Sequence, residues 1–301
     1  MAAAGILQAP FGRVLTAMVT PFTAGGQLDE AAAQRLATQL VEAGNDGLVV
    51  SGTTGESPTT SDEEKERLIR AVVEAVGDRA QIVAGVGTND TAHTVELAHQ
   101  AHKAGAVGLL VVTPYYSKPP QTGLLEHFRR IADSTDLPVM LYDIPARSGV
   151  PIHTDTMLRL GEHERIVAVK DAKGDLHETS KLLAQSSLAV YCGEDALNLP
   201  LLAMGAVGMV SVVAHVCTDR FVQMVRAVDG GDLATARQLN AAVLPAIRGL
   251  MTRTQGAIMA KAALQLLGVL DHRTVRSPLV DATPDEVELL RQDLAEAGLL
   301  R

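Results

Sequence analysis

One lysine stands at a position where its amine could do chemistry. The sequence has seven lysines, and only Lys170 lies at the end of a short apolar run, residues 166–172. We predict that the others lie in polar loops or on helix surfaces, where a charged amine is solvated: Lys65, Lys103, Lys118, Lys173, Lys181 and Lys261. Lys170 is therefore the first candidate for a reactive group.

The run that contains Lys170 is predicted to be a strand. Successive side chains of a strand point to opposite faces, which places Ala168 on the face of Lys170. Val167 and Val169 are then expected to share the other face. A buried ammonium is unfavourable unless an acid pairs with it, whereas a neutral lysine amine is a nucleophile for a carbonyl carbon. The position alone leaves open a covalent lysine or an ion pair with Asp171 or another acid.

Hydroxyl groups gather at the ends of other apolar runs. Three of the four tyrosines stand there, Tyr115, Tyr116 and Tyr142, and Thr53 and Thr54 follow a third run. A hydroxyl both donates and accepts a hydrogen bond, so a chain from a threonine through two tyrosines would pass a proton toward an imine on the lysine. Any one of these tyrosines could instead serve only to pack the core. Packing explains less well why three of them stand at the ends of apolar runs.

Two segments could bind carboxylates. Residues 52–56 (Gly-Thr-Thr-Gly-Glu) precede a predicted helix and can present backbone N–H groups and hydroxyls to an anionic oxygen. Arg147 lies in a loop after another run, and its guanidinium suits a second carboxylate. A surface ion pair is the alternative for Arg147.

Eight apolar runs rich in Val, Leu and Ile alternate with longer segments of helical spacing. They are residues 14–21, 47–52, 82–86, 108–114, 139–145, 166–172, 188–194 and 208–214. Such runs are typical of parallel strands covered on both faces, and eight of them predict an α/β fold, a (β/α)₈ TIM barrel whose strand C-termini form the functional face. A doubly wound open sheet is the competing architecture, but no Gly-x-Gly-x-x-Gly follows the first run.

Helices are predicted between the runs and after the last of them. The clearest are residues 29–43, 62–76, 91–104, 121–134, 219–228, 232–250, 255–267 and 284–297. Gly44, Gly77 and Gly105 follow three of them, where a left-handed residue commonly ends a helix. Thr60 or Ser61 is expected to cap the segment 62–76. We divide the chain into residues 1–216, the catalytic barrel region, and 217–301, the last barrel helix with a C-terminal helical extension.

Composition restricts the possible partners. The chain has 26 Lys and Arg against 35 Asp and Glu, a formal charge of −9, and no basic run, which argues against a nucleic-acid binder. Cys192 and Cys217 cannot build a disulfide framework and favour a reducing compartment. Residues 1–13 lack a basic segment before their apolar stretch, and no apolar stretch is long enough to span a membrane. We expect a cytoplasmic protein that binds small molecules.

Six motifs, in order, resemble those of the dihydrodipicolinate synthase (4-hydroxy-tetrahydrodipicolinate synthase) family, one of the class I pyruvate-dependent aldolases of the N-acetylneuraminate lyase superfamily. They are residues 52–57 (GTTGES), 111–119 (VVTPYYSKP), 141–149 (LYDIPARSG), 169–175 (VKDAKGD), 193–195 (GED) and 208–215 (GMVSVVAH). The similarity runs from about residue 13 to the C-terminus and is closest to actinobacterial members.

The resemblance implies a lyase that forms a Schiff base. Pyruvate would condense with Lys170, become an enamine and attack L-aspartate 4-semialdehyde in the diaminopimelate route to lysine. Thr53, Tyr116 and Tyr142 would form the proton relay, with Tyr116 reaching across a subunit interface. The resemblance implies no cofactor beyond the covalent lysine imine, no metal, and a homotetramer built as a dimer of dimers.

The resemblance also implies four substrate-binding positions. Thr54 would hold the carboxylate of pyruvate and Arg147 that of the aldehyde. Gly193 and the carbonyl of Val210 would border the site. The nearest alternative is a sister activity, an N-acetylneuraminate lyase or a 2-keto-3-deoxy sugar-acid aldolase. A barrel without turnover is a further alternative.

The sequence departs from the family pattern where many bacterial members bind free lysine as an inhibitor. His93 stands at a glutamate position, Asp62 and Lys65 stand at histidine positions, and Pro58 follows the serine. Asn89 and Tyr115 are kept. Losing a carboxylate and adding a cation should weaken the binding of a cationic ligand, so we predict weak or absent inhibition by lysine.

Overall fold

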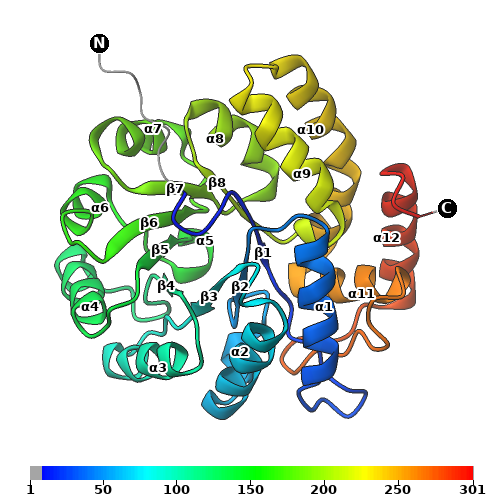
Figure 1. Ribbon diagram of the computed structural model, residues 1–301, viewed down its shortest axis with the longest axis horizontal. Helices are drawn as coiled ribbons and strands as arrows, with labels where there is room; N and C mark the ends of the chain where they lie inside the picture. The colour runs from blue at the N-terminus through cyan, green and yellow to red at the C-terminus, as the bar shows by residue number, and fades with distance from the viewer. Residues whose placement is uncertain (1–8, 301) are drawn as a thin grey trace.

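A computed structural model describes residues 9–300 of the chain, and Figure 1 shows its strands surrounded by helices. Eight parallel strands close into a barrel in sequence order, β1 pairing with β8, which confirms the predicted TIM barrel. The strands are β1 (Val14–Ala17), β2 (Gly47–Val50), β3 (Gln81–Gly85), β4 (Gly108–Val112), β5 (Val139–Asp143), β6 (Ile166–Asp171), β7 (Ala189–Cys192) and β8 (Gly208–Ser211). Most strands end a few residues before the end of the corresponding predicted run, because the apolar runs continue into the loops of the functional face.

The barrel interior is filled by side chains that alternate with those facing the helices. Leu15, Val49, Val83 and Leu110 belong to one buried cluster inside the barrel. The strand residues between them pack against the helices in a second, larger cluster. This period of two, with both faces buried, is why each strand reads as a continuous apolar run.

The alternation in β6 differs from the prediction at one residue. Ala168 lies in the interior cluster and Val169 in the outer one, as expected. Val167, however, packs against the interior cluster. The pairing with β5 explains this, because Val139 is opposite Ile166 and Met140 is opposite Ala168, so Val167 forms a bulge. The bulge does not alter the alternation that leads to Lys170.

Helices cover the outside of the barrel (Figure 1). The long ones that follow strands are α1 (Glu30–Glu42), α2 (Asp62–Val76), α3 (Thr91–Lys103), α4 (Gln121–Asp133) and α7 (Leu176–Gln185). Shorter helical segments are η1 (Ser57–Thr59), α5 (Pro145–Ser148), α6 (Thr154–Leu160), η2 (Asp195–Leu197) and α8 (Asn198–Met204). Each predicted helix is present, and the four predicted between strands have ends that differ by at most one residue. After the last strand, the helix predicted from residue 219 begins at residue 214, and the one predicted over 232–250 ends at residue 247, where a π-helical turn follows.

The helix ends follow the predicted chemistry except at one glycine. Ser61 caps α2 and forms a reciprocal capping box with Glu64. Gly44 and Gly105 adopt left-handed φ angles of 109° and 96°. The prediction for Gly77 is wrong: its φ is −64°, because its N–H continues the helical pattern by donating to the carbonyl of Val73.

The C-terminal helices lie on one side of the barrel (Figure 1). They are α9 (Ala214–Asp229), α10 (Leu233–Ile247), the π-helical turn η3 (Arg248–Thr252), α11 (Gly256–Leu266) and α12 (Pro284–Glu296). The boundary predicted between residues 216 and 217 falls inside α9, where Cys217 has non-helical angles. The division of the chain there stays a prediction. Residues 1–8 and 301, which the N-terminal and domain predictions include, lie outside the described residues.

Cys192 and Cys217 are both buried and free. Within residues 9–300, no helix combines the length and the apolar character needed to cross a membrane.

Closure of the barrel depends on close backbone contact at the start of β8. A Cβ built on Gly208 would lie 2.1 Å from the carbonyl oxygen of Arg13, which neighbouring strands hold in place. We expect Gly208→Ala to lower the free energy of unfolding by about 1–3 kcal/mol, since the backbone must move to admit the methyl group. Denaturant unfolding measures this. In the control Gly123→Ala, in α4, the nearest atom would lie 3.4 Å away, so stability should be equal or slightly higher. Equal stability of Gly208→Ala and the wild type would contradict this account.

Candidate active site

A cavity of about 440 Å³ opens at the C-terminal end of the barrel. Its lining includes Thr53, Tyr142 and Arg147 among the predicted site residues, together with Tyr115. These residues come from loops after β2, β4 and β5 and from β5 itself. The cavity therefore lies where the strand ends of this fold place functional groups.

Lys170 and Tyr142 face each other inside the barrel. They are register partners on β6 and β5, and each is 5% exposed. The Lys170 Nζ lies 4.3 Å from the centre of the Tyr142 ring. Asp171 points to the opposite face and accepts a hydrogen bond from Thr179, so it does not pair with Lys170. Among residues 9–300, no carboxylate forms a salt bridge with Lys170, which argues against the ion-pair interpretation.

Gly193 and Val210 lie against this pair. A Cβ built on Gly193 would come within 2.8 Å of Cγ and 3.0 Å of Cε of Lys170, so a larger residue there would force the lysine side chain to shift. Val210 is buried in the interior cluster that also contains Tyr142. Gly193, half-buried just after β7, therefore lies against the lysine, and Val210 lies in the barrel interior.

The loop that carries the two threonines is held in a strained shape. Ser51, which precedes the loop, and Glu56, its last residue, have φ angles of 58° and 55°, in the left-handed region that favours glycine. Thr20 donates a hydrogen bond to the carbonyl of Gly55 at 2.6 Å. Thr53 is half-buried and lines the cavity, whereas Thr54 is buried and is absent from its lining.

Tyr116 is not brought to the site within this chain. Its side chain is 90% exposed, and its φ of 70° turns the backbone through a left-handed conformation. Across the described part of the chain, no hydrogen bond joins the hydroxyls of Thr53, Tyr116 and Tyr142. The predicted relay is thus incomplete in one subunit.

Arg147 stands in the short helix α5, directly after the end of β5. Its side chain is exposed at the rim of the cavity. Glu194, after β7, is half-buried near Arg147 and Lys170. Burial raises the pKa of the Glu194 carboxyl and the neighbouring Asp195 raises it further, while the charges of Arg147 and Lys170 act in the opposite direction. We did not predict Glu194 as a site residue, although it lies in the Gly-Glu-Asp motif.

The prediction that the other lysines are solvated is wrong for three of them. Lys65 is 7% and Lys261 0% exposed, and the side chain of Lys173 is 8% exposed. Each has polar partners that offset its burial. Lys65 donates to the carbonyl of Thr60, and Lys261 pairs with Glu56. Burial lowers the pKa of Lys65, and Asp62 opposes that change.

Two buried carboxylates and one lysine lie behind the pair of Lys170 and Tyr142. Asp143 and Asp171 are register partners that point out of the barrel, and the Lys173 Nζ lies 3.8 Å from one oxygen of each. Asp143 accepts a hydrogen bond from the N–H of Ile152, but its Oδ2 has none. Burial raises the pKa of Asp143 to about 6, against the effects of Ile152 and Lys173. No sequence pattern singled out this cluster, because its members look like ordinary residues at strand ends.

The far end of the cavity contains the residues that depart from the family pattern. The His93 Nε2 lies 2.9 Å from one oxygen of Asp62, and the Lys65 Nζ lies 3.7 Å from the other. Asn89 and Tyr115 line the same end. Asp62, the acidic residue that the described part of the chain contributes to the cavity lining, is already engaged by two basic side chains.

Residues 10–297 match the model of the Dihydrodipicolinate synthetase family. The chain belongs to this family. It is 67% identical over 290 residues to a 4-hydroxy-tetrahydrodipicolinate synthase of Kineococcus radiotolerans. The aligned residues cover 96% of this chain and 94% of the Kineococcus enzyme. This chain is 64% identical, with the same coverage, to a 4-hydroxy-tetrahydrodipicolinate synthase of Acidothermus cellulolyticus.

The fold agrees with solved structures of the Dihydrodipicolinate synthetase family. DHDPS from Cyanidioschyzon merolae, crystallised with lysine bound, is 40% identical with a TM-score of 0.94, over 97% of this chain and 100% of that one. The expected resemblance to the family is therefore confirmed.

The cluster behind Lys170 and Tyr142 predicts that the stability of the protein depends on pH. An unfolded Asp143 loses its proton near pH 3.8, whereas the folded protein holds it until about pH 6. Its contribution to stability is therefore full below pH 3.8 and is lost as the pH rises through 6. Relative to wild type, Asp143→Asn should gain about 2 kcal/mol in the free energy of unfolding between pH 4 and pH 7.

Urea unfolding at several pH values measures this difference. Asp136→Asn is the control, because the Asp136 side chain is 84% exposed and its pair with Arg165 is on the surface. A constant difference between Asp143→Asn and wild type across this pH range would show that Asp143 has no unusual affinity for its proton.

Proposed function

We propose that this protein catalyses the condensation of pyruvate with L-aspartate 4-semialdehyde, the reaction of a 4-hydroxy-tetrahydrodipicolinate synthase in diaminopimelate and lysine biosynthesis. The observation that carries the proposal is the buried amine of Lys170, which faces Tyr142 and has no carboxylate partner in residues 9–300. Membership of the family and the names of its relatives support the choice of substrates.

The chemistry starts at the amine of Lys170. It attacks the ketone carbon of pyruvate, and loss of water leaves an imine. A proton leaves the methyl carbon, and the resulting enamine attacks the aldehyde carbon of the second substrate, whose oxygen takes up a proton. The amino group of that substrate then replaces Lys170 at the imine carbon, which closes the ring and frees the lysine. The lysine itself holds the substrate covalently, so no external cofactor takes part.

The remaining site residues bind the substrates and move protons. Thr54 and the loop N–H groups hold the carboxylate of pyruvate, and Arg147 holds the carboxylate of the aldehyde. Thr53, Tyr142 and Tyr116 form the proton relay. The position of Tyr142 against the Lys170 amine supports its part in forming the imine.

We further propose that the relay is completed by a second subunit. Tyr116 is a large aromatic side chain that is 90% exposed in a strained backbone conformation, which suits a residue that packs against another copy of the chain. In this proposal the protein is a homotetramer, a dimer of dimers, and Tyr116 enters the neighbour's site.

Two free cysteines support a cytoplasmic location.

Replacing the amine tests the reaction. Lys170→Arg and Lys170→Ala should lose at least about 10³-fold in turnover, because neither side chain can form the imine. Borohydride reduction in the presence of pyruvate, followed by mass spectrometry, should add a pyruvate-derived mass to the wild-type peptide that contains Lys170 and to neither variant. Lys103→Arg, on an exposed part of α3, is the control and should react as the wild type does.

Two outcomes would overturn the proposed function. A wild-type protein without the adduct would be a barrel that does not react with pyruvate. A protein that forms the adduct but turns over N-acetylneuraminate, and not L-aspartate 4-semialdehyde with pyruvate, would be a sister aldolase.

We also propose that free lysine inhibits weakly or not at all. Asp62, the carboxylate at the far end of the cavity, already contacts His93 and Lys65, so it has little attraction left for a cationic ligand. A lost charge contact is worth about 1.5–3 kcal/mol, or about 10- to 100-fold in affinity. Half-inhibition by lysine at sub-millimolar concentration would contradict this proposal. His93→Glu is the matched variant, and it should bind lysine more tightly than wild type in the same titration.

A further inference from the structure

The loop of the two threonines is fastened to the C-terminal helices by a buried ion pair. Glu56, the last residue of the loop, is 2% exposed, and its carboxylate contacts the Lys261 Nζ from α11. Lys261 is fully buried and also donates to the carbonyl of Thr274 at 2.7 Å. The backbone N–H of Arg276 donates to the second oxygen of Glu56 at 2.8 Å. Both oxygens of the carboxylate therefore have partners from a part of the chain some 200 residues away.

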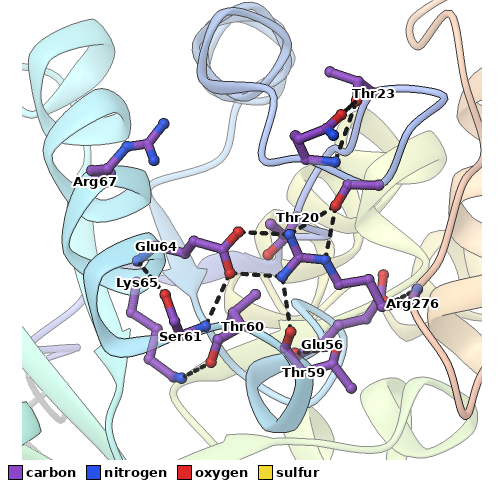
Figure 2. A network of polar contacts seen from close by, with 12 residues as sticks. Thr20, Thr23, Glu56, Thr59, Thr60, Ser61, Glu64, Lys65, Arg67 and Arg276 are labelled. Atoms are coloured by element: carbon purple, nitrogen blue, oxygen red, sulfur yellow. Dashed lines mark hydrogen bonds and ion pairs between the residues drawn. The ribbon is translucent and has the colours of Figure 1, made fainter.

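The side chain of Arg276 extends this connection, as Figure 2 shows. Its guanidinium pairs with both oxygens of Glu64 in α2, each at 2.6 Å, and donates to the carbonyls of Thr59 and Gly26. Arg276 thus joins the loop after β1, the loop after β2 and the start of α2. The bidentate contact with Arg276 lowers the pKa of Glu64 to about 2.

An aromatic ring completes the surroundings of these cations. The Lys261 Nζ lies 4.1 Å and the Arg276 Cζ 4.2 Å from the centre of the Phe22 ring. Phe22 follows β1 and is itself 2% exposed. The ring attracts both cations but carries no net charge. The carboxylate of Glu56 is therefore the negative charge that balances the buried charge of Lys261.

The geometry of Glu56 links this network to the threonines. Its left-handed φ of 55° reverses the chain, and its N–H donates to the carbonyl of Thr53 at 3.1 Å. A glutamate does not prefer this conformation, so contacts elsewhere must hold it there. Thr59 contacts the backbone carbonyl of Glu56, while Lys261 and Arg276 hold its carboxylate from a distant part of the chain.

We propose that Glu56, held by Lys261, is a positioning residue that aims Thr53 and Thr54 at the carboxylate of bound pyruvate. This inference rests on the proposed function, since it assigns pyruvate to the loop. Glu56 itself points away from the cavity and touches no substrate. Its role is to keep the loop in one shape, and Lys261 in α11 makes the C-terminal region part of the active site.

The test compares Glu56→Gln, Lys261→Met and the double variant with wild type. Each should raise the KM for pyruvate about tenfold or more, because a misplaced loop binds the carboxylate less well. The pyruvate concentration needed for half-maximal borohydride trapping on Lys170 should rise in parallel. The KM for the aldehyde should change less than twofold, since Arg147 lies on another loop. If Glu56 and Lys261 acted on stability alone, their replacement would not change the KM for pyruvate more than the KM for the aldehyde.

Two comparisons keep stability apart from positioning. The double variant leaves no unpaired buried charge, so its unfolding temperature should recover relative to Lys261→Met while its pyruvate KM stays high. If Lys261→Met does not fold, Glu56→Gln and the double variant suffice. Asp293→Asn is the matched control, because Asp293 is also buried and bound by two arginines, Arg248 and Arg253, in the C-terminal region. It should lower stability and leave both KM values unchanged.

Three results would overturn the inference. They are a double variant with the wild-type KM for pyruvate, equal increases in both KM values, and a loss confined to kcat. Borohydride trapping with pyruvate alone distinguishes a failure of the inference about Glu56 from a failure of the proposed function. A wild type that forms the adduct but ignores the aldehyde still tests the positioning, whereas a wild type without an adduct overturns both.

Discussion

The site depends on one amine, that of Lys170, which lies inside a closed ring of strands and forms no salt bridge with a carboxylate among residues 9–300. The alternation of side chains achieves this, since Tyr142 and Lys170 point inward while the next residues of the same strands, Asp143 and Asp171, point outward. Lys173 contacts both of those acids. A shift of one residue in β6 would exchange amine and acid and remove the site. For the direction of the Lys170 side chain, the register of the residues after Val167 therefore matters more than the bulge at Val167.

The barrel alone does not explain the shape of its threonine loop. Ser51 and Glu56 adopt conformations that each disfavour a side chain, and such strain persists only where surrounding contacts hold it. Thr20, after β1, supplies one of those contacts, but the carboxylate of Glu56 is held by Lys261 of α11 and by Arg276. The C-terminal region, whose helices pack outside the ring of Figure 1, thus reaches the functional face through the side chain of Lys261 and through Arg276.

Local patterns allowed the sequence to predict the eight strands, the helices and the inward direction of Lys170. Burial that depends on distant partners could not be predicted in this way. Lys261 is the one charged residue in the apolar helix α11, whose residues 256–264 are all buried, and only the fold brings Glu56 to it from 205 residues away. Gly77 kept right-handed angles because one more helical hydrogen bond was available. The direction of Tyr116 likewise depends on backbone angles that its neighbours in sequence do not reveal.

Charge within the cavity differs in sign from the charge of the whole chain. The protein carries a formal charge of −9, yet Arg147 and Lys65 line the cavity, Lys170 lies beside it, and Asp62 is already engaged by basic side chains. Surface charges act over about 8–10 Å at physiological salt, whereas charges facing a partly buried cavity are screened much less. An anionic keto acid that enters the cavity is therefore governed by the nearby cations rather than by the net charge. An acidic protein can in this way bind acidic substrates while repelling polyanions too large to enter.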